Sequence, residues 1–355
     1  MRQVARQAVP VLATLTILAA SMVNSTFAAR QYTLSSSPVR LAMQSDNPTW
    51  QTNLSTPPQP IQAPGVALGQ DGNIYVFGGS LWLGGDSYPK SKELDTTYIY
   101  HPLANTWTRG KNMPVPRYRD RAVTLPDGRI VVLGGGANCA DRPNWGTLCH
   151  YGTVYDRVDV YTPRTDSWSS LAPMLSPRTD FSAALYHGRI FAIGGADGNT
   201  ALSSMEAYDP TRNHWSAESS LPKQLLFATA TLDAHGDIAV IGGLNGPDAA
   251  ASDNTMYVYD GHGWSNGIAL PQPLHDPEAT LGRDGLLYVI GGYQTISPSG
   301  AYLSAVETYN SQTQAWSSKA SLPVPAVSGT AVTVPNGQIY VVGGTEGGNS
   351  RAPFK

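Results

Sequence analysis

The chain has 355 residues, of which 36 are glycine and 27 are proline, and its formal net charge is −3. Many turn-forming residues and only 14% charged residues indicate an all-β protein rather than a helical one. Nucleic acid is not an expected partner, because phosphate binding requires a basic surface that the sequence does not suggest.

The first 29 residues have the layout of an export signal. Arg2 and Arg6 precede an apolar run over residues 8–23, which is followed by small residues up to Ala29. This order is typical of a secretory signal peptide. An uncleaved membrane anchor is the alternative, although the run is short for a spanning helix. We expect residues 1–29 to be a signal peptide, residues 30–355 to form a single domain, and the protein to be a secreted or periplasmic monomer without membrane insertion after signal removal.

A glycine followed, after five residues, by a Gly-Gly pair occurs six times. The five residues between are apolar and rich in β-branched or aromatic types, so each copy predicts one buried strand. The predicted strands span residues 73–77, 129–133, 189–193, 237–241, 286–290 and 338–342. Asp, His or Asn precedes each leading glycine, and such dipeptides favour tight hairpin turns. The sequence therefore predicts a repeating hairpin, with its strands named a and b.

A tyrosine followed by a tryptophan, usually seven residues later, recurs after the Gly-Gly pairs. Turn-forming residues lie between the two aromatic residues, which predicts two further strands, c and d, joined by a tight connection. The pairs are Tyr100 and Trp107, Tyr161 and Trp168, Tyr208 and Trp215, Tyr259 and Trp264, and Tyr309 and Trp316. Large side chains in so regular a register are expected to have a structural packing role.

This combination resembles the Kelch repeat, because successive Gly-Gly pairs lie 48 to 60 residues apart, close to the Kelch period. The resemblance covers about residues 39–344. It implies an all-β, six-bladed Kelch β-propeller with four antiparallel strands in each blade and the aromatic side chains packed between blades. The sixth Gly-Gly has no tyrosine and tryptophan after it, whereas Trp50 precedes the first complete repeat. We therefore infer that residues 39–53 supply strands c and d to the last blade.

Two predicted loops are longer than the others and contain the tryptophans outside the repeat register. Strand directions alternate, so the b-to-c and d-to-a connections are expected on one face, where binding residues concentrate. Trp82 lies in the loop over about residues 80–95, and Trp145 lies in the loop over about residues 136–157. Both are candidates for stacking on a sugar or for contacting a protein, and the alternative is that each folds onto its own blade.

Cys139 and Cys149 are the two cysteines of the chain, and they flank Trp145 within one loop. An even number of cysteines in an exported protein favours a disulfide over a metal pair. We expect this disulfide to stiffen the loop.

The predicted channel mouth, where the d-to-a connections enter the innermost strands, carries the remaining candidate residues. They are Tyr118, Arg119, Asp180, His275, Asp276, Glu278 and Ser328. Resemblance to animal Kelch proteins that bind acidic peptides implies a ligand role for Arg119 and Ser328. Asp180 and Asp276 carry the opposite charge, which suits a polyhydroxylated ligand better than a strongly acidic one. Arg117 and Arg178 are expected to pair with carboxylates that hold the links between blades.

The leading interpretation is an exported binding protein that recognises a carbohydrate or an extracellular protein on this face. The alternative is a sugar-acting enzyme that resembles a sialic acid epimerase or mutarotase, with Arg119 as electrostatic partner and His275 or Glu278 as base. A copper-radical sugar oxidase is less favoured, because the expected disulfide leaves no free thiol. The sequence contains no G-x-S-x-G, H-E-x-x-H or phosphate-binding motif, so no cofactor and no metal site is predicted.

Overall fold

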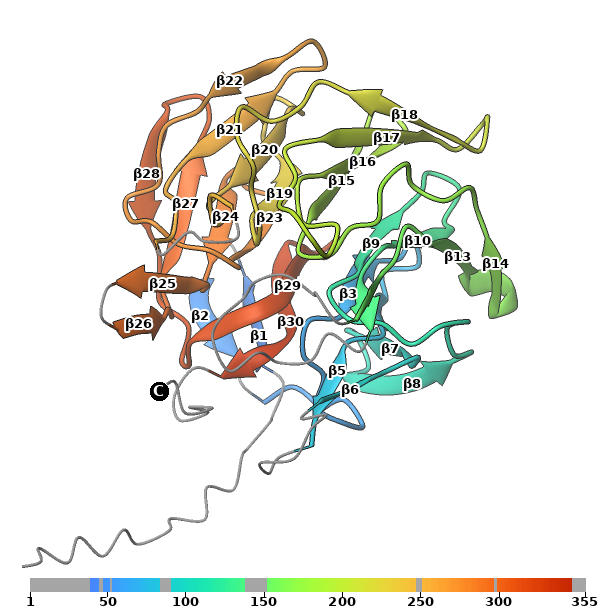
Figure 1. Cartoon of the computed structure of the whole chain (residues 1–355). Helices are drawn as coiled ribbons and strands as arrows, with labels where there is room; N and C mark the ends of the chain where they lie inside the picture. The colour runs from blue at the N-terminus through green and yellow to red at the C-terminus, as the bar shows by residue number, and fades with distance from the viewer. Residues whose placement is uncertain are drawn as a thin grey trace, which may run out of the picture. The chain divides into compact units, whose positions relative to one another are not determined.

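The computed structural model describes residues 39–44, 47–51, 53–83, 91–137, 152–246, 251–296 and 299–346. Within these ranges it contains six four-stranded antiparallel sheets, which we call blades 1 to 6 (Figure 1). The predicted all-β class and the predicted blade of four antiparallel strands are confirmed. The same ranges contain no helix with the length and hydrophobicity needed to cross a membrane.

Each blade orders its strands from a to d. Blades 1 to 3 consist of β3 (Gly65–Leu68), β4 (Ile74–Phe77), β7 (Thr97–His101) and β8 (Thr106–Gly110); β9 (Arg121–Thr124), β10 (Ile130–Leu133), β13 (Val158–Thr162) and β14 (Ser167–Ser170); and β15 (Ser182–Tyr186), β16 (Arg189–Ile193), β17 (Met205–Asp209) and β18 (His214–Glu218). Blades 4 to 6 consist of β19 (Thr229–Leu232), β20 (Ile238–Ile241), β21 (Met256–Tyr259) and β22 (Trp264–Asn266); β23 (Glu278–Leu281), β24 (Leu287–Ile290), β27 (Val306–Asn310) and β28 (Ala315–Ser318); and β29 (Ala326–Thr333), β30 (Gln338–Glu346), β1 (Val39–Gln44) and β2 (Asn47–Gln51).

Three b-to-c connections contain short two-stranded hairpins of their own. These are β5 (Ser80–Trp82) with β6 (Ser91–Glu93), β11 (Gly136–Ala137) with β12 (Thr153–Val154), and β25 (Tyr293–Ile296) with β26 (Ser299–Tyr302). A single 3-10 turn, Pro163–Thr165, is the helical element of the described residues.

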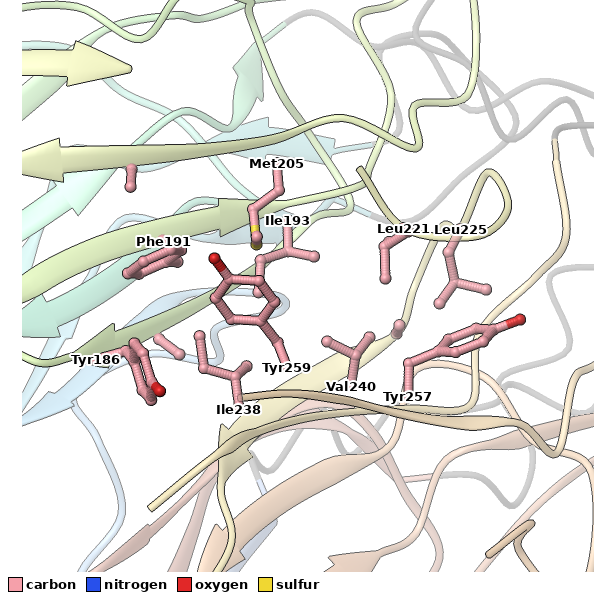
Figure 2. Packing of buried hydrophobic residues seen from close by; sticks show 13 residues of the cluster. Tyr186, Phe191, Ile193, Met205, Leu221, Leu225, Ile238, Val240, Tyr257 and Tyr259 are labelled. Carbon is pink, nitrogen blue, oxygen red and sulfur yellow. The ribbon is translucent and has the colours of Figure 1, made fainter. Parts of the chain in front are cut away.

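The apolar strand before each Gly-Gly pair is strand b, and its side chains are buried between neighbouring blades. Between blades 3 and 4, for example, Tyr186 and Phe191 pack against Ile238 and Tyr259 (Figure 2). Burying both faces of strand b explains why its five residues are almost all apolar rather than alternating with polar ones. The core therefore lies between the blades.

The second glycine of each pair is required because the d-to-a link that enters the same blade passes very close to it. Gly135 and Gly195 have φ angles of +84° and +87°. A Cβ atom on Gly135 would lie 2.7 Å from the carbonyl oxygen of Tyr118, and one on Gly195 would lie 2.5 Å from that of Thr179. Only glycine combines this backbone conformation with so close an approach.

The repeated tryptophans join each blade to the preceding one. Each indole Nε1 donates a hydrogen bond to a main-chain carbonyl of the preceding d-to-a link, at 2.8 to 3.0 Å. The pairs are Trp50 and Ala320, Trp107 and Ser55, Trp168 and Lys111, Trp215 and Ala172, Trp264 and Ser219, and Trp316 and Ile268. In blades 1 to 5 the tryptophan ring also contacts its tyrosine partner on strand c, with centroids 5.0 to 5.3 Å apart. The structural packing role predicted for the repeated aromatic residues is confirmed.

The last blade is assembled from both ends of the described chain. Strand β1 pairs antiparallel with β30, from Val39 opposite Gly343 to Gln44 opposite Gln338. In Figure 1 the blue strands β1 and β2 accordingly lie beside the red strand β30. The predicted completion of the last blade by the N-terminal strands is confirmed. The innermost strands contact one another in the order β3, β9, β15, β19, β23 and β29, and β29 returns to β3.

Candidate functional site

The d-to-a links and the b-to-c connections lie on the same face, as the strand directions predicted. In five blades a residue of the d-to-a link forms a β-bridge with a residue that follows the Gly-Gly pair. The bridges join Gln62 and Ser80, Tyr118 and Gly136, Thr179 and Ala196, Leu226 and Leu244, and His275 and Tyr293. The two sets of connections therefore form one surface around the innermost strands.

Where each d-to-a link meets the innermost strand, one residue adopts a left-handed backbone conformation, with φ between +47° and +59°. These residues, which we call the mouth ring, are Ala63, Arg119, Asp180, Phe227, Asp276 and Ser328. The conformation is costly for residues other than glycine, and such strain is often found at functional sites.

Main-chain hydrogen bonds between neighbouring blades hold the mouth ring. The Arg119 N–H donates to the Ala63 carbonyl at 2.8 Å, and the Ala63 N–H donates to the Ser328 carbonyl at 3.1 Å. The Phe227 N–H donates to the Asp180 carbonyl at 2.9 Å, and the Asp276 N–H donates to the Phe227 carbonyl at 2.7 Å. These bonds join Ser328, Ala63 and Arg119 into one group and Asp180, Phe227 and Asp276 into another, and the side-chain contacts of Arg119 with Asp180 and of Ser328 with Asp276 connect the two groups.

Arg119 connects blades 2, 3 and 4 at the mouth ring. Its guanidinium pairs with the carboxylate of Asp180, and its Cζ atom lies 4.7 Å from the centroid of the Phe227 ring. Burial opposes the positive charge of Arg119, but the nearby Asp180 carboxylate outweighs burial and raises the pKa of Arg119. The side chain is 30% exposed. Arg119 is therefore a charged, partly exposed group at the mouth, and its charge is already balanced by Asp180 of the same chain.

Blade 5 places His275 and Asp276 on the other side of the mouth. The Asp276 carboxylate accepts a hydrogen bond from the Ser328 hydroxyl. The Nδ1 atom of His275 lies 2.9 Å from the Ser252 hydroxyl, and the Tyr293 ring lies edge-on at 5.2 Å. Burial lowers the pKa of His275 to about 4, so its imidazole is uncharged at neutral pH and is a weak base.

A cavity of about 350 Å³ lies between the innermost strands. Its lining includes polar residues at the start of the innermost strands, small apolar residues at the next position, and threonines further along. The polar residues include Arg121, Ser182, Thr229, Asp276, Glu278 and Thr330. In blades 2 to 6 an alanine follows one of these polar residues directly along the innermost strand. These alanines are Ala122, Ala183, Ala230, Ala279 and Ala331.

Glu278 is the buried acid of this cavity, with 4% of its surface exposed. Its Oε1 atom accepts a hydrogen bond of 2.5 Å from the Gly329 N–H of the next blade. Burial and the neighbouring Asp276 raise the pKa of Glu278 to about 8, although Gly329 and Arg121 oppose the shift. Glu278 is therefore mostly protonated at pH 7 and can act as a hydrogen-bond donor.

The sequence patterns did not predict Arg121 as a site residue, although it occupies the repeat position equivalent to Glu278. Each of these two residues pairs with the last residue before its Gly-Gly, Leu133 or Ile290. Comparing the six links position by position could have identified Arg121 as part of the same level. Phe227 was overlooked because the apolar residues of blade 4 suggested no polar site.

Three further predicted residues, Arg117, Tyr118 and Arg178, lie within the described ranges. The buried guanidinium of Arg117 pairs with Asp159, and that of Arg178 pairs with Glu206 at 2.6 Å, so the predicted structural role of both arginines is confirmed. Tyr118 lies beside Arg119, whose Cζ atom is 5.5 Å from the tyrosine ring centroid.

The predicted loop site falls largely outside the described ranges. Trp82 ends strand β5, but its side chain is outside them, as are Trp145, Cys139 and Cys149. Their binding roles and the disulfide stay predictions. Among the described residues, no group of three or more histidine, cysteine, aspartate and glutamate side chains could hold a metal ion.

Comparisons with known proteins place these observations in a family. The Kelch motif matches residues 65–114, 117–175, 177–222 and 281–323, which together are more than half of the chain. The mouse Kelch-like protein 35 is 28% identical over 248 residues, and the human Kelch-like protein 23 is 27% identical over 277 residues. These matches cover 70% and 76% of this chain but only 38% and 43% of the two relatives.

The horseshoe-crab (Limulus polyphemus) protein alpha-scruin is 27% identical over 259 residues, covering 70% of this chain and 27% of its own length. The solved structure of YjhT has the same fold, with a TM-score of 0.65 and 15% sequence identity over 83% of this chain and 95% of its own. With four matched segments, Gly-Gly pairs that end strand b, and tryptophans that join successive four-stranded blades, the chain belongs to the Kelch-repeat family.

Proposed function

We propose that this protein is an exported, six-bladed binding propeller that holds a small carbohydrate in the cavity between its innermost strands. The observation that carries the proposal is the cavity itself, whose volume of about 350 Å³ lies in the range of small-molecule sites. Access is through the face made by the b-to-c and d-to-a connections. This proposal narrows the expected ligand from a carbohydrate or protein to a carbohydrate.

The polar groups of the cavity suit a ligand with several hydroxyl groups. The Asp276 carboxylate is a hydrogen-bond acceptor, and protonated Glu278 supplies a donor. The hydroxyl of Thr229 can both donate and accept.

Isothermal titration with a panel of neutral monosaccharides and disaccharides tests the proposal. Thr229→Val removes a cavity hydroxyl while keeping the shape of the side chain, and it is expected to weaken binding about 5- to 50-fold. Thr313→Val, on an exposed turn of blade 5, is the matched control and should bind like wild type. Absence of sugar binding, together with capture of a protein on the loop face, would favour the protein-binding alternative.

The protonation state of Glu278 favours a second candidate function, an epimerase or mutarotase of sugars. A carboxyl group with a pKa of about 8 inside a small cavity is suited to proton transfer at neutral pH. Arg119 is the proposed electrostatic partner, and His275 is less suitable as the base because its pKa is about 4. Proton NMR of anomer and epimer interconversion, with Glu278→Gln as the inactive variant, tests this function. No acceleration over a sugar panel would remove it.

The loop tryptophans and the export of the protein belong to the same proposal. Trp82→Ala and Trp145→Ala variants that bind the ligand as wild type would exclude a loop contribution while leaving the cavity as the site. Cell fractionation followed by mass spectrometry of the mature N-terminus tests export and cleavage near residue 29. Size-exclusion chromatography with light scattering tests the proposed monomer.

A further inference from the structure

The charged groups that line the channel cavity are unevenly distributed. Arg121 is the cationic residue of the lining, whereas Asp276 and Glu278 are its acidic residues. Arg121 lies on β9 of blade 2, and both acids belong to blade 5. The cavity therefore has a cationic side and an acidic side.

The two sides face one another across the channel. Arg121 and Glu278 are at the same level, because each pairs with the residue immediately before a Gly-Gly pair. In the closed sequence of inner-strand contacts, β9 is second and β23 is fifth, so two strands separate them in either direction. A ligand that fills the cavity at this level contacts Arg121 with one end and the acids of blade 5 with the other.

The guanidinium of Arg121 forms no ion pair among the described residues. Its Nη1 atom donates a hydrogen bond of 3.3 Å to the main-chain carbonyl of Asp120. The Asp120 side chain is fully buried and lies against Gly65, outside the cavity lining. Asp276 is engaged by Ser328, and Glu278 is engaged by the Gly329 N–H. A guanidinium without a carboxylate partner in a confined cavity is the group that an anionic ligand would satisfy.

We propose that the cavity selects a small sugar acid, whose carboxylate pairs with Arg121 and whose hydroxyl groups face Asp276 and Glu278. This inference rests on the proposed carbohydrate-binding function and names the ligand class. The planar guanidinium presents two parallel N–H groups to a carboxylate, which favours the acid over the corresponding neutral sugar. The carboxylate is also held on the side of the channel opposite Asp276, where repulsion between the two anions is smallest.

The test compares each acid with the neutral sugar that differs from it only at C6. Glucuronate and glucose, and galacturonate and galactose, are titrated into the full-length protein at pH 6.5 by isothermal titration calorimetry. Arg121→Gln removes the charge, and Arg121→Lys retains it without the planar fork. Arg212→Gln is the matched control, because the Arg212 side chain is 81% exposed on a surface turn.

The proposal predicts that an acid binds at least tenfold more tightly than its neutral partner. Arg121→Gln should remove this preference while changing the affinity for the neutral sugar less than threefold, and Arg121→Lys should retain part of the preference. Arg212→Gln should bind like wild type. A cooperative thermal melt establishes that each variant is folded, and if Arg121→Gln does not fold, the wild-type preference and the Arg121→Lys variant decide.

Equal binding of acid and neutral sugar by the wild type would overturn the inference and leave the proposed carbohydrate-binding function intact. An acid preference that persists in folded Arg121→Gln would also overturn it. Failure of both acids and both neutral sugars, as well as the wider sugar panel, would overturn the proposed function together with the inference.

Discussion

We expect the buried side chain of Asp120 to make the stability of the propeller depend on pH. The residue is fully buried, and neither oxygen of its carboxyl group has a hydrogen-bond partner among the described residues. Burial raises its pKa to about 7, although the nearby Arg117 guanidinium opposes the shift. In the unfolded chain an aspartate has a pKa of about 3.9. The folded protein therefore binds this proton more tightly than the unfolded chain does.

The size of the effect follows from the difference between the two pKa values. The contribution of the bound proton to stability is fully present below pH 4, declines progressively as the pH rises, and is lost above about pH 7. At about 1.4 kcal/mol per pKa unit, a difference of about three units corresponds to about 4 kcal/mol. Asp120→Asn, which remains uncharged at every pH, should therefore be more stable than wild type by about 2 to 4 kcal/mol at pH 8.5. At pH 5, about one unit above the unfolded pKa, the difference should fall to about 1.5 kcal/mol.

Urea unfolding at pH 5, 7 and 8.5, followed by tryptophan fluorescence, measures this difference. Asp156→Asn is the control, since Asp156 is exposed and its substitution should change stability equally little at each pH. Comparing variant with wild type at the same pH removes the contribution of Glu278, which titrates in the same range. A difference between Asp120→Asn and wild type that does not change with pH would refute the reasoning, because it would mean that Asp120 is not a neutral, buried acid.

Three further substitutions test the framework by urea unfolding. Gly195→Ala should lower the free energy of unfolding by about 3 kcal/mol or more, because its Cβ would lie 2.5 Å from a carbonyl oxygen. Gly188→Ala, where a Cβ has open space, should lower it by only about 1 to 2 kcal/mol. Equal losses in the two variants would contradict the close-approach argument. Trp215→Phe removes the indole hydrogen bond to the preceding link and should cost about 1 to 3 kcal/mol, and a neutral effect would argue against that bond. Arg178→Met leaves the carboxylate of Glu206 buried without its partner and should cost about 3 to 5 kcal/mol, much of which a Glu206→Gln second substitution should restore.

Much of the fold could be predicted because its signals are local and repeated. Six hairpin turns, six apolar strands and six tryptophans in register each report the same backbone geometry, so an error in one copy is corrected by the others. The composition of the last blade could also be predicted, since Trp50 has no Gly-Gly before it and the last Gly-Gly has no tryptophan after it. The structural roles of Arg117 and Arg178 followed from the same register.

The candidate site was harder to predict from the sequence, because its properties depend on contacts between residues that are distant in the chain. The sequence identified Arg119, Asp180, Asp276 and Ser328 as equivalent positions, but it did not indicate that Arg119 pairs with Asp180 and stacks on Phe227. The charge states of these groups could not be predicted from the sequence either, since burial by neighbouring blades sets the pKa values of groups such as His275.

The sequence by itself determined the blade, because hairpin turns, strand b and the Gly-Gly pair depend on residues within one repeat. The tertiary structure alone decided what the innermost strands enclose. Arg121 and Glu278 are separated by more than 150 residues, and they share one cavity only because the ring of inner strands brings blade 2 opposite blade 5. Closure of that ring also excludes water from Glu278 and so controls its charge.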